Sequence, residues 1–313
     1  MAEGGNTWSN ASFGEFQTAF LPLAFGLQFI WAFIINSLAI WMFLSQSKPW
    51  HIGIIYAFNL ALNDLLYVIT LPLLVVYYFN NKNWIFGDTF CKMERFLFTC
   101  NLYGSMFLIT CISFNRYLAI VHPMFTRNTI QAKHGKVVSL LVWALAIAIT
   151  SPTLYFSRVS VAGNKTECLG TSTGELLPEY FPYSLCLAVF GCAVPFAVTF
   201  WSYICIFREL RSSQSVSRSE RRQVAVLVCV VIVLYAVSFI PYTCLRNINM
   251  YRRLYNRDRG RPISIYKLYQ VSKCLLTLSM CIHPLLYTDF FHKIKRLCTS
   301  DRQQKPTRAQ SEF

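Results

Sequence analysis

Seven long apolar segments limit what this 313-residue chain can fold into more than any other feature. A helix needs about 20 mainly apolar residues to cross the hydrocarbon core of a bilayer. The segments long enough to do so are residues 20–44, 52–79, 89–121, 136–156, 178–207, 221–250 and 266–289. Charged residues make up 14% of the chain, whereas soluble domains carry about 25%. The sequence therefore predicts an all-α integral membrane protein with a seven-transmembrane helix bundle.

The connections between the segments are short and no repeat divides the chain, so one bundle domain is expected. We assign residues 1–19 to an extracellular N-terminal tail, 20–289 to the bundle, 290–298 to a short amphipathic helix and 299–313 to a cytosolic tail. The N-terminal tail shows no pattern of a cleavable signal peptide, so the first span is expected to direct insertion. Local breaks are expected where proline lies inside a span, at Pro72, Pro152, Pro195, Pro241 and Pro284.

The distribution of basic residues predicts the orientation. The tail before the first span has no Lys or Arg, whereas residues 208–222 have five and the chain from Lys293 onward has six. Because cytosolic loops are enriched in Lys and Arg, the C-terminus is expected in the cytosol and the N-terminus outside. The triplets that begin at Asn10 and Asn164 are glycosylation acceptors, and both then face outward. Cys91 and Cys168 would meet the same oxidising compartment, where a disulfide between them is expected.

One outward-facing loop runs against this charge rule. Residues 246–273 hold eight Lys or Arg and a single acid. A solvated loop that happens to be basic would explain the charge. The alternative is an electropositive mouth that attracts an anion. On that interpretation five arginines would steer the anion inward: Arg252, Arg253, Arg257, Arg259 and Arg261.

Other function classes find little support in the sequence. The net charge of +15 could suggest nucleic acid, but the apolar spans and the lack of RNA-binding or helix-turn-helix patterns argue against a nucleic-acid polymer as partner. The spacing of Cys and His matches no metal site. No Gly-rich phosphate loop or hydrolase motif indicates an enzyme. A transporter or channel stays open as an alternative, although the sequence lacks the inverted repeats typical of transporters.

Two polar residues inside the spans require an explanation. Asp64 lies in the middle of the second span. Placing a carboxylate at that depth of the membrane costs free energy, so Asp64 is a candidate functional residue. With Asn36 and Ser105 at comparable depth it could hold an allosteric sodium ion. A hydrogen-bonded carboxylate without an ion is equally open. Arg116 ends the third span, where it could reach water or lock the cytosolic ends of the third and sixth helices.

The chain resembles the rhodopsin-like (class A) G-protein-coupled receptors along essentially its whole length. The resemblance rests on Asn36, Asp64, Cys91 with Cys168, Arg116, Tyr117, Trp143, Pro195, Tyr203, Pro241, Pro284 and Tyr287. It implies a multi-pass receptor of the plasma membrane that needs no cofactor, couples to a heterotrimeric G protein and meets arrestin and receptor kinases. The switch residues that it implies are Asn115, Arg116, Tyr117, Tyr203, Pro241, His283, Pro284 and Tyr287. Cys298, at the end of the amphipathic helix, is a palmitoylation candidate.

Within that class the chain is similar to the metabotropic purinergic receptors, through stretches such as "SFIPYTCLR" and "YQVSK". The motifs "NRY" and "HPLLY" come nearest the ATP-preferring subtype. This resemblance implies an extracellular nucleotide as ligand, ATP or a related di- or triphosphate. It implies signalling through Gq, phospholipase C and calcium, with Gs as a second route. The residues implied in ligand binding are Arg95, Tyr103, Thr243, Arg246, Tyr269 and Lys273.

Three of these residues are cations at similar depth on three helices, and they repel one another unless an anion joins them. Receptors for small carboxylates share this basic triad and stay open as an alternative. Several features depart from the pattern of the relatives: Ile35 precedes Asn36 where glycine is usual, and the N-terminal tail and the last extracellular loop lack the cysteines of a second disulfide. Thr243 stands where histidine is usual, and Lys273 where arginine is usual. Asn115 replaces the usual acid, and His283 replaces the usual Asp or Asn, which weakens the sodium hypothesis.

Overall fold

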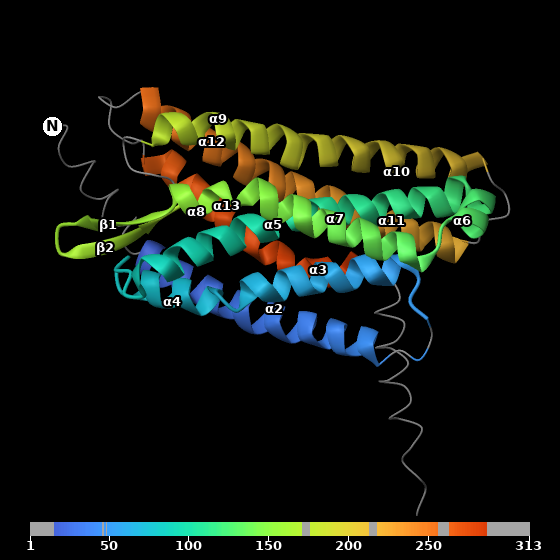
Figure 1. The fold of residues 1–313 in the computed structure, drawn as a ribbon, viewed down its shortest axis with the longest axis horizontal. Coiled ribbons are helices and arrows are strands. Elements are labelled where there is room, and N and C mark those ends of the chain that lie inside the picture. The colour runs from blue at the N-terminus through green and yellow to red at the C-terminus, as the bar shows by residue number, and fades with distance from the viewer. Residues whose placement is uncertain are drawn as a thin grey trace, which may run out of the picture.

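The chain is a bundle of long helices that lie side by side along one axis (Figure 1). The computed structural model of the protein describes residues 16–45, 47, 49–170, 176–212, 218–255 and 263–286. Within these residues each predicted apolar segment is helical over most of its length. The predicted all-α bundle is confirmed.

The seven spans consist of the following helices. They are α2 (Leu21–Leu44); α3 (Ile52–Val68) with α4 (Leu71–Phe79); α5 (Gly87–Val121); α7 (Ala132–Thr150) with α8 (Pro152–Phe156); α9 (Leu177–Cys186) with α10 (Val194–Ser212); α11 (Arg218–Val233) with α12 (Ile240–Tyr255); and α13 (Ile263–Ile282). Short π-helical segments precede α2 (Phe16–Phe20), join α9 to α10 (Leu187–Ala193) and join α11 to α12 (Leu234–Phe239). A short helix, α6 (Pro123–Thr129), connects the third and fourth spans, and a 3-10 turn (His283–Leu286) ends the seventh.

Several helices run past their predicted edges. The fourth span begins at Ala132 rather than residue 136, and the sixth ends at Tyr255 rather than residue 250. Hydropathy marks only the stretch that meets hydrocarbon, whereas backbone hydrogen bonding continues into the polar layer beyond it.

The five prolines at which a break was predicted all coincide with a change of helix geometry, whereas Pro182 lies inside α9. Pro72 is the second residue of α4, and α8 begins at Pro152. The two internal π-helical segments end two residues before Pro195 and Pro241, and Pro284 lies in the 3-10 turn. Proline lacks an amide N–H and its ring clashes with the preceding turn, so it interrupts the regular hydrogen-bond ladder.

Among the residues that the structure describes, six helical stretches are long and apolar enough to cross a membrane by themselves. The seventh span does not meet that measure. Its helix α13 carries Lys267, Gln270, Ser272 and Lys273 in its outer part. Two of these, Gln270 and Lys273, line an internal cavity. These polar side chains of α13 therefore point into the bundle.

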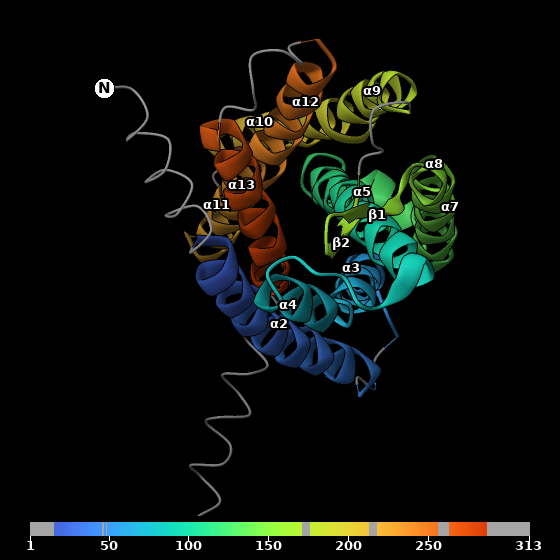
Figure 2. The same ribbon diagram turned by 90° about the vertical axis from the view of Figure 1, so that its left-hand side faces the viewer.

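A two-stranded antiparallel hairpin caps one end of the bundle, which we call the hairpin end (Figures 1 and 2). Its strands are β1 (Arg158–Ala162) and β2 (Lys165–Leu169), with Val159 opposite Cys168. The turn between them contains Asn164, which is exposed. The opposite end of the bundle carries α6.

Apolar side chains cover the outside of the bundle as well as its core. Leu60 is fully buried, whereas Leu140 and Trp31 are 69% and 61% exposed. Soluble monomers rarely show such extensive exposed apolar surface. Polar bonds inside join neighbouring spans: the indole of Trp143 donates to Asn59 (2.9 Å). The outer surface is the one that acyl chains would cover.

Candidate functional site

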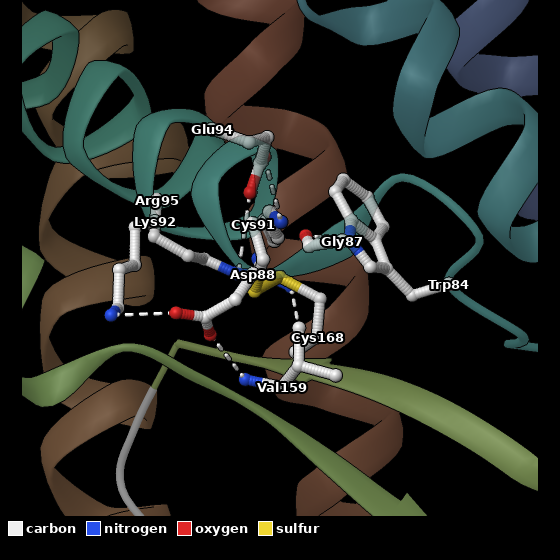
Figure 3. The surroundings of a disulfide bond; sticks show 10 residues. Trp84, Gly87, Asp88, Cys91, Lys92, Glu94, Arg95, Val159 and Cys168 are labelled. Carbon is white, nitrogen blue, oxygen red and sulfur yellow. Dashed lines mark hydrogen bonds and ion pairs between the residues drawn. A yellow bond between two sulfur atoms is a disulfide. The ribbon is translucent and has the colours of Figure 1, made fainter.

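The β1–β2 hairpin is held over the start of α5 by a disulfide (Figure 3). Cys91 in α5 is bonded to Cys168 in β2, with their Cα atoms 5.6 Å apart. Beside it the Asp88 carboxylate accepts a hydrogen bond from the Val159 amide (3.1 Å) and pairs with Lys92 (2.6 Å). The predicted disulfide is confirmed, and it makes the hairpin one wall of a cavity at this end of the bundle.

The cavity has a volume of about 520 Å³ and lies among α4, α5, α12, α13 and the hairpin. Five cationic side chains line it: Lys82, Arg95, Arg246, Arg253 and Lys273. Six aromatic rings line it as well: Tyr77, Tyr78, Phe98, Tyr242, Tyr266 and Tyr269. Among the described lining residues Glu167 is the only acid. Cations and aromatic rings in one concave site suit an anion that also carries a flat, apolar group.

The three predicted cations are brought together on three different helices, and each is anchored differently. Arg95 of α5 donates from Nη2 to the Cys168 carbonyl oxygen (2.9 Å). Arg246 of α12 donates to the Tyr180 hydroxyl and is only 6% exposed. Lys273 of α13 is 3% exposed and its Nζ lies 4.8 Å from the centre of the Phe98 ring.

A buried acid lies beside two of these cations. The Glu94 carboxylate is fully buried. Its Oε2 lies 3.3 Å from Arg95 Nε, and its Oε1 lies 3.9 Å from Lys273 Nζ. Figure 3 shows Glu94 and Arg95 adjacent on α5 next to the disulfide. Arg246 has no carboxylate within 4.0 Å in the described part of the chain.

Two of the six predicted ligand residues lie outside the cavity lining. Tyr103 is 1% exposed, and its ring packs so closely against Gly191 that a Cβ at that position would clash with it. Thr243 is 7% exposed, and its hydroxyl has no hydrogen-bond partner among the described residues. Arg95, Arg246, Lys273 and Tyr269 line the cavity. Ligand contact by Tyr103 and Thr243 remains a prediction.

The predicted steering arginines are only partly described. Arg253 lines the cavity, and Arg252 is exposed near the end of α12. Arg257, Arg259 and Arg261 lie outside the described residues. Lys82 was not predicted, yet its Nζ lies 5.2 Å from the centre of the Tyr266 ring at the cavity wall.

Asp64 belongs to a second polar cluster, deep in the bundle. Its Oδ2 accepts a hydrogen bond from Nδ1 of His283 (2.8 Å), and its Oδ1 accepts one from Asn101 (3.0 Å). Ser105 accepts a hydrogen bond from the Asn63 side chain (3.0 Å). Asp64 therefore has a protein partner at each oxygen, and the His283 imidazole occupies one side of the carboxylate.

Asn36 completes the predicted sodium set. Its amide nitrogen donates to the carbonyls of Ala32 (2.9 Å) and Met280 (3.2 Å). Its Oδ1 is buried and has no partner among the described residues. Sodium binding stays a prediction, and it requires the His283 imidazole to move away from Asp64.

Four of the predicted switch residues, Asn115, Arg116, Tyr117 and Tyr203, lie toward the opposite end of the bundle, whereas His283 belongs to the cluster around Asp64. Tyr203 and Ser113 share a hydrogen bond of 2.7 Å between α10 and α5. The Tyr117 hydroxyl lies 3.0 Å from Nε2 of His122. Asn115 lines an apolar cavity of about 460 Å³ with α3, α6 and α7. Arg116, the residue after Asn115, is half-buried. Tyr287 and Cys298 lie outside the described residues, as does Asn10.

Sequence reasoning missed Glu94, although one signal could have found it. An ionisable residue inside a transmembrane span is a functional hypothesis by default, and Glu94 meets that rule as well as Asp64 does. Its neighbour Arg95 drew attention through the resemblance, whereas no motif includes Glu94.

Known proteins match the chain over most of its length. The family model described as 7 transmembrane receptor (rhodopsin family) matches residues 35–287. Purinoceptor 1 of Gallus gallus is 41% identical over 292 residues, which cover 90% of this chain and 80% of that protein. Purinoceptor 1 of Homo sapiens is 38% identical over 310 residues, with 92% and 82% covered. Purinoceptor 11 of Homo sapiens is 39% identical over 297 residues, with 87% and 79% covered.

These proteins are receptors rather than enzymes, and they are multi-pass proteins of the plasma membrane. The matched region begins inside the first span, at residue 35, and contains the helices of the other six spans and both cysteines of the disulfide. The chain therefore belongs to the rhodopsin family of seven-transmembrane receptors and, within it, to the purinoceptors.

Proposed function

We propose that this receptor binds an extracellular nucleotide, ATP or a related di- or triphosphate, in the cavity at its hairpin end. The observation that carries the proposal is the set of five cationic side chains around one cavity, three of them on different helices. The relatives named purinoceptors support the same ligand class.

The chemistry of the cavity fits a nucleotide in two parts. Arg95 and Arg246 present planar guanidinium groups, which can donate two parallel hydrogen bonds to a phosphate. Lys273 adds a compact charge without that fork. The surrounding tyrosines and Phe98 offer rings against which a base can stack. A small carboxylate would use the cations and leave the rings unused, so we favour the larger, phosphorylated ligand.

The hairpin end then faces the outside of the cell. A disulfide is stable in an oxidising compartment, which supports this orientation. The arginines at the end of α12, together with Arg257, Arg259 and Arg261, would steer the anion into the cavity. The opposite end would meet a heterotrimeric G protein, with Gq and calcium release as the first candidate route and Gs as the second. Arrestin and receptor kinases would be further partners.

Calcium release tests the ligand and the route together. Cells that express the receptor are given ATP, ADP or succinate, and cells with empty vector are treated in parallel. A calcium or cyclic AMP response to a nucleotide but not to succinate is expected. A response to succinate alone would replace the nucleotide with a small carboxylate as ligand.

The orientation predicts which asparagine residues carry sugar. Asn164 is exposed in the hairpin turn, and Asn10 lies in the N-terminal tail. Substituting each with Gln is expected to remove one glycan, seen as a faster-migrating band that enzymatic deglycosylation no longer shifts in the double variant. A wild-type band that deglycosylation leaves unchanged would remove this support for the orientation.

Asn115→Asp is expected to lower signalling in the absence of ligand. An aspartate before Arg116 offers a charged partner, which holds the arginine more strongly than the neutral amide does. Arg116 is half-buried, so the added pair is worth about 1 kcal/mol at most, or about a fivefold decrease in the active fraction. Basal second-messenger output is measured at matched surface expression in cells treated with apyrase.

The maximal response should persist in Asn115→Asp because the ligand cavity lies at the other end of the bundle. Asn115→Gln serves as the neutral control and should keep basal output near that of the wild type. A wild type without basal output, or a higher output in Asn115→Asp, would show that the missing acid does not set the resting state.

A further inference from the structure

Glu94 is a buried acid in a site whose proposed ligand is an anion. It is fully buried, and it lies beside Arg95 and Lys273. An acid at that place works against an anionic ligand through simple Coulomb repulsion. Its position therefore requires a physical account that the cation cluster alone does not supply.

The acid lies behind the cations rather than in front of them. Arg95 and Lys273 line the cavity, whereas Glu94 does not. A ligand phosphate can thus contact both cations without touching the carboxylate. Arg246, on the facing helix α12, contacts the Tyr180 hydroxyl and has no carboxylate within 4.0 Å in the described ranges. The positive charge of the cavity is therefore unevenly distributed. The Glu94 carboxylate partly neutralises it on the side of α5 and α13 but not on the side of α12.

The ion pairs of Glu94 are loose. Neither Arg95 Nε nor Lys273 Nζ is hydrogen-bonded to the carboxylate, and the side chain of the buried Tyr67 lies beside it. At 3.3 Å and 3.9 Å the carboxylate offsets charge without directed bonds. The Lys273 ammonium can therefore turn toward a phosphate while the acid stays behind it, whereas Arg95 Nη2 would first have to release the Cys168 carbonyl oxygen.

We propose that Glu94 is the internal counter-anion of the ligand cavity, and that it limits how steeply affinity rises with the number of phosphates on the ligand. The inference rests on the proposed nucleotide function. In the empty receptor Glu94 keeps the partly buried Arg95 and the buried Lys273 close to each other. In the occupied receptor the negative charge of Glu94 weakens the attraction between the cations and each negative charge of the ligand. Each additional phosphate therefore increases the affinity less than it would without Glu94.

Glu94→Gln tests the proposal because glutamine keeps the shape and removes the charge. Affinities of AMP, ADP and ATP are measured on purified full-length receptor by displacement of a fluorescent nucleotide. The medium is low in magnesium, since bound Mg²⁺ would mask the ligand charge. The gain in affinity from one nucleotide to the next is expected to increase about fivefold for each added negative charge in Glu94→Gln.

Two further variants separate charge from shape and position. Glu94→Met is neutral and of similar length, so it should show the same steeper dependence on ligand charge. Glu179→Gln removes the same charge from an exposed position on α9, where solvent screens it, and it should behave like the wild type.

The measured affinities distinguish the proposal from a purely structural role of Glu94. An equal change in affinity for all three nucleotides would assign Glu94 a structural role and overturn the proposal. So would an unchanged dependence on ligand charge, or loss of both neutral variants from the cell surface. A wild type that binds none of the nucleotides would instead refute the proposed function itself, which distinguishes the two failures.

Discussion

Potency of the nucleotide is expected to fall about a hundredfold in Arg246→Ala and about tenfold in Lys273→Ala. A hydrogen bond to a charged group is worth about 1.5–3 kcal/mol, which corresponds to roughly ten- to a hundredfold in an equilibrium constant. Arg246 is expected at the upper end because it has no carboxylate within 4.0 Å among the described residues and presents a forked donor. Lys273 shares its charge with Glu94, 3.9 Å away, so less of that charge is available to the ligand.

Dose–response curves at matched surface expression measure both losses. Arg246→Lys keeps the charge and removes the fork, so its potency should lie between the wild type and Arg246→Ala. Tyr180→Phe serves as a further comparison, because it removes the hydroxyl that Arg246 contacts and leaves the ring. Unchanged potency in both alanine variants would refute the assignment of this cavity as the phosphate site.

The thermal stability of the solubilised receptor is expected to fall strongly in His283→Ala. His283 and Asp64 are both essentially buried and joined by a bond of 2.8 Å. Removing one partner of a buried pair typically costs about 3–5 kcal/mol because the other is left with an unmet charge or polar group. A decrease in melting temperature of roughly 5–10 °C follows for a domain of this size. A thermal-shift assay in detergent measures it in the absence of ligand.

A double-mutant cycle identifies the cause of that loss. In an Asp64→Asn background the side chain at position 64 is neutral, so the further change His283→Ala should cost only about 1 kcal/mol, the worth of a neutral hydrogen bond. Non-additivity of about 2–4 kcal/mol would then belong to the pair. Equal losses in both backgrounds would show that His283 stabilises the bundle by packing, for example against Phe239, rather than through Asp64.

The dependence of thermal stability on sodium concentration tests whether sodium binds near Asp64. Raising the sodium concentration should then stabilise His283→Ala more than the wild type, because removal of the imidazole exposes one oxygen of Asp64. Lithium or choline at equal ionic strength is the control. An equal response of both proteins to the three salts would leave Asp64 as a hydrogen-bonded carboxylate without an ion.

The sequence alone determined the number of spans, their approximate edges and the positions of their breaks. Hydrocarbon accepts only backbone that is fully hydrogen-bonded, so an apolar run of sufficient length has little choice except a helix. Proline removes a backbone hydrogen bond, and changes of helix geometry accompany Pro72, Pro195 and Pro241, although α9 continues through Pro182. The disulfide followed from two cysteines that topology places in one compartment.

Which face of each helix points inward was not determined by the sequence pattern. In a soluble protein the apolar stripe marks the core, but lipid is as apolar as the core is. Phe25 is fully buried and Trp31, on the same helix, is 61% exposed, although both are large and apolar. For the same reason hydropathy could not reveal that Tyr103 packs against Gly191, away from the cavity.

Only the tertiary structure decided which polar side chains meet. Asp64 pairs with His283, 219 residues later in the chain, and not with Ser105, whose partner is Asn63. Glu94 lies behind Arg95 and Lys273, a contact between α5 and α13 that no local pattern contains. The rotation of each helix about its axis sets these contacts, and that rotation results from the packing of many side chains at once. The sequence determined where the charges lie along each helix; the packing of the helices decided which charges face one another.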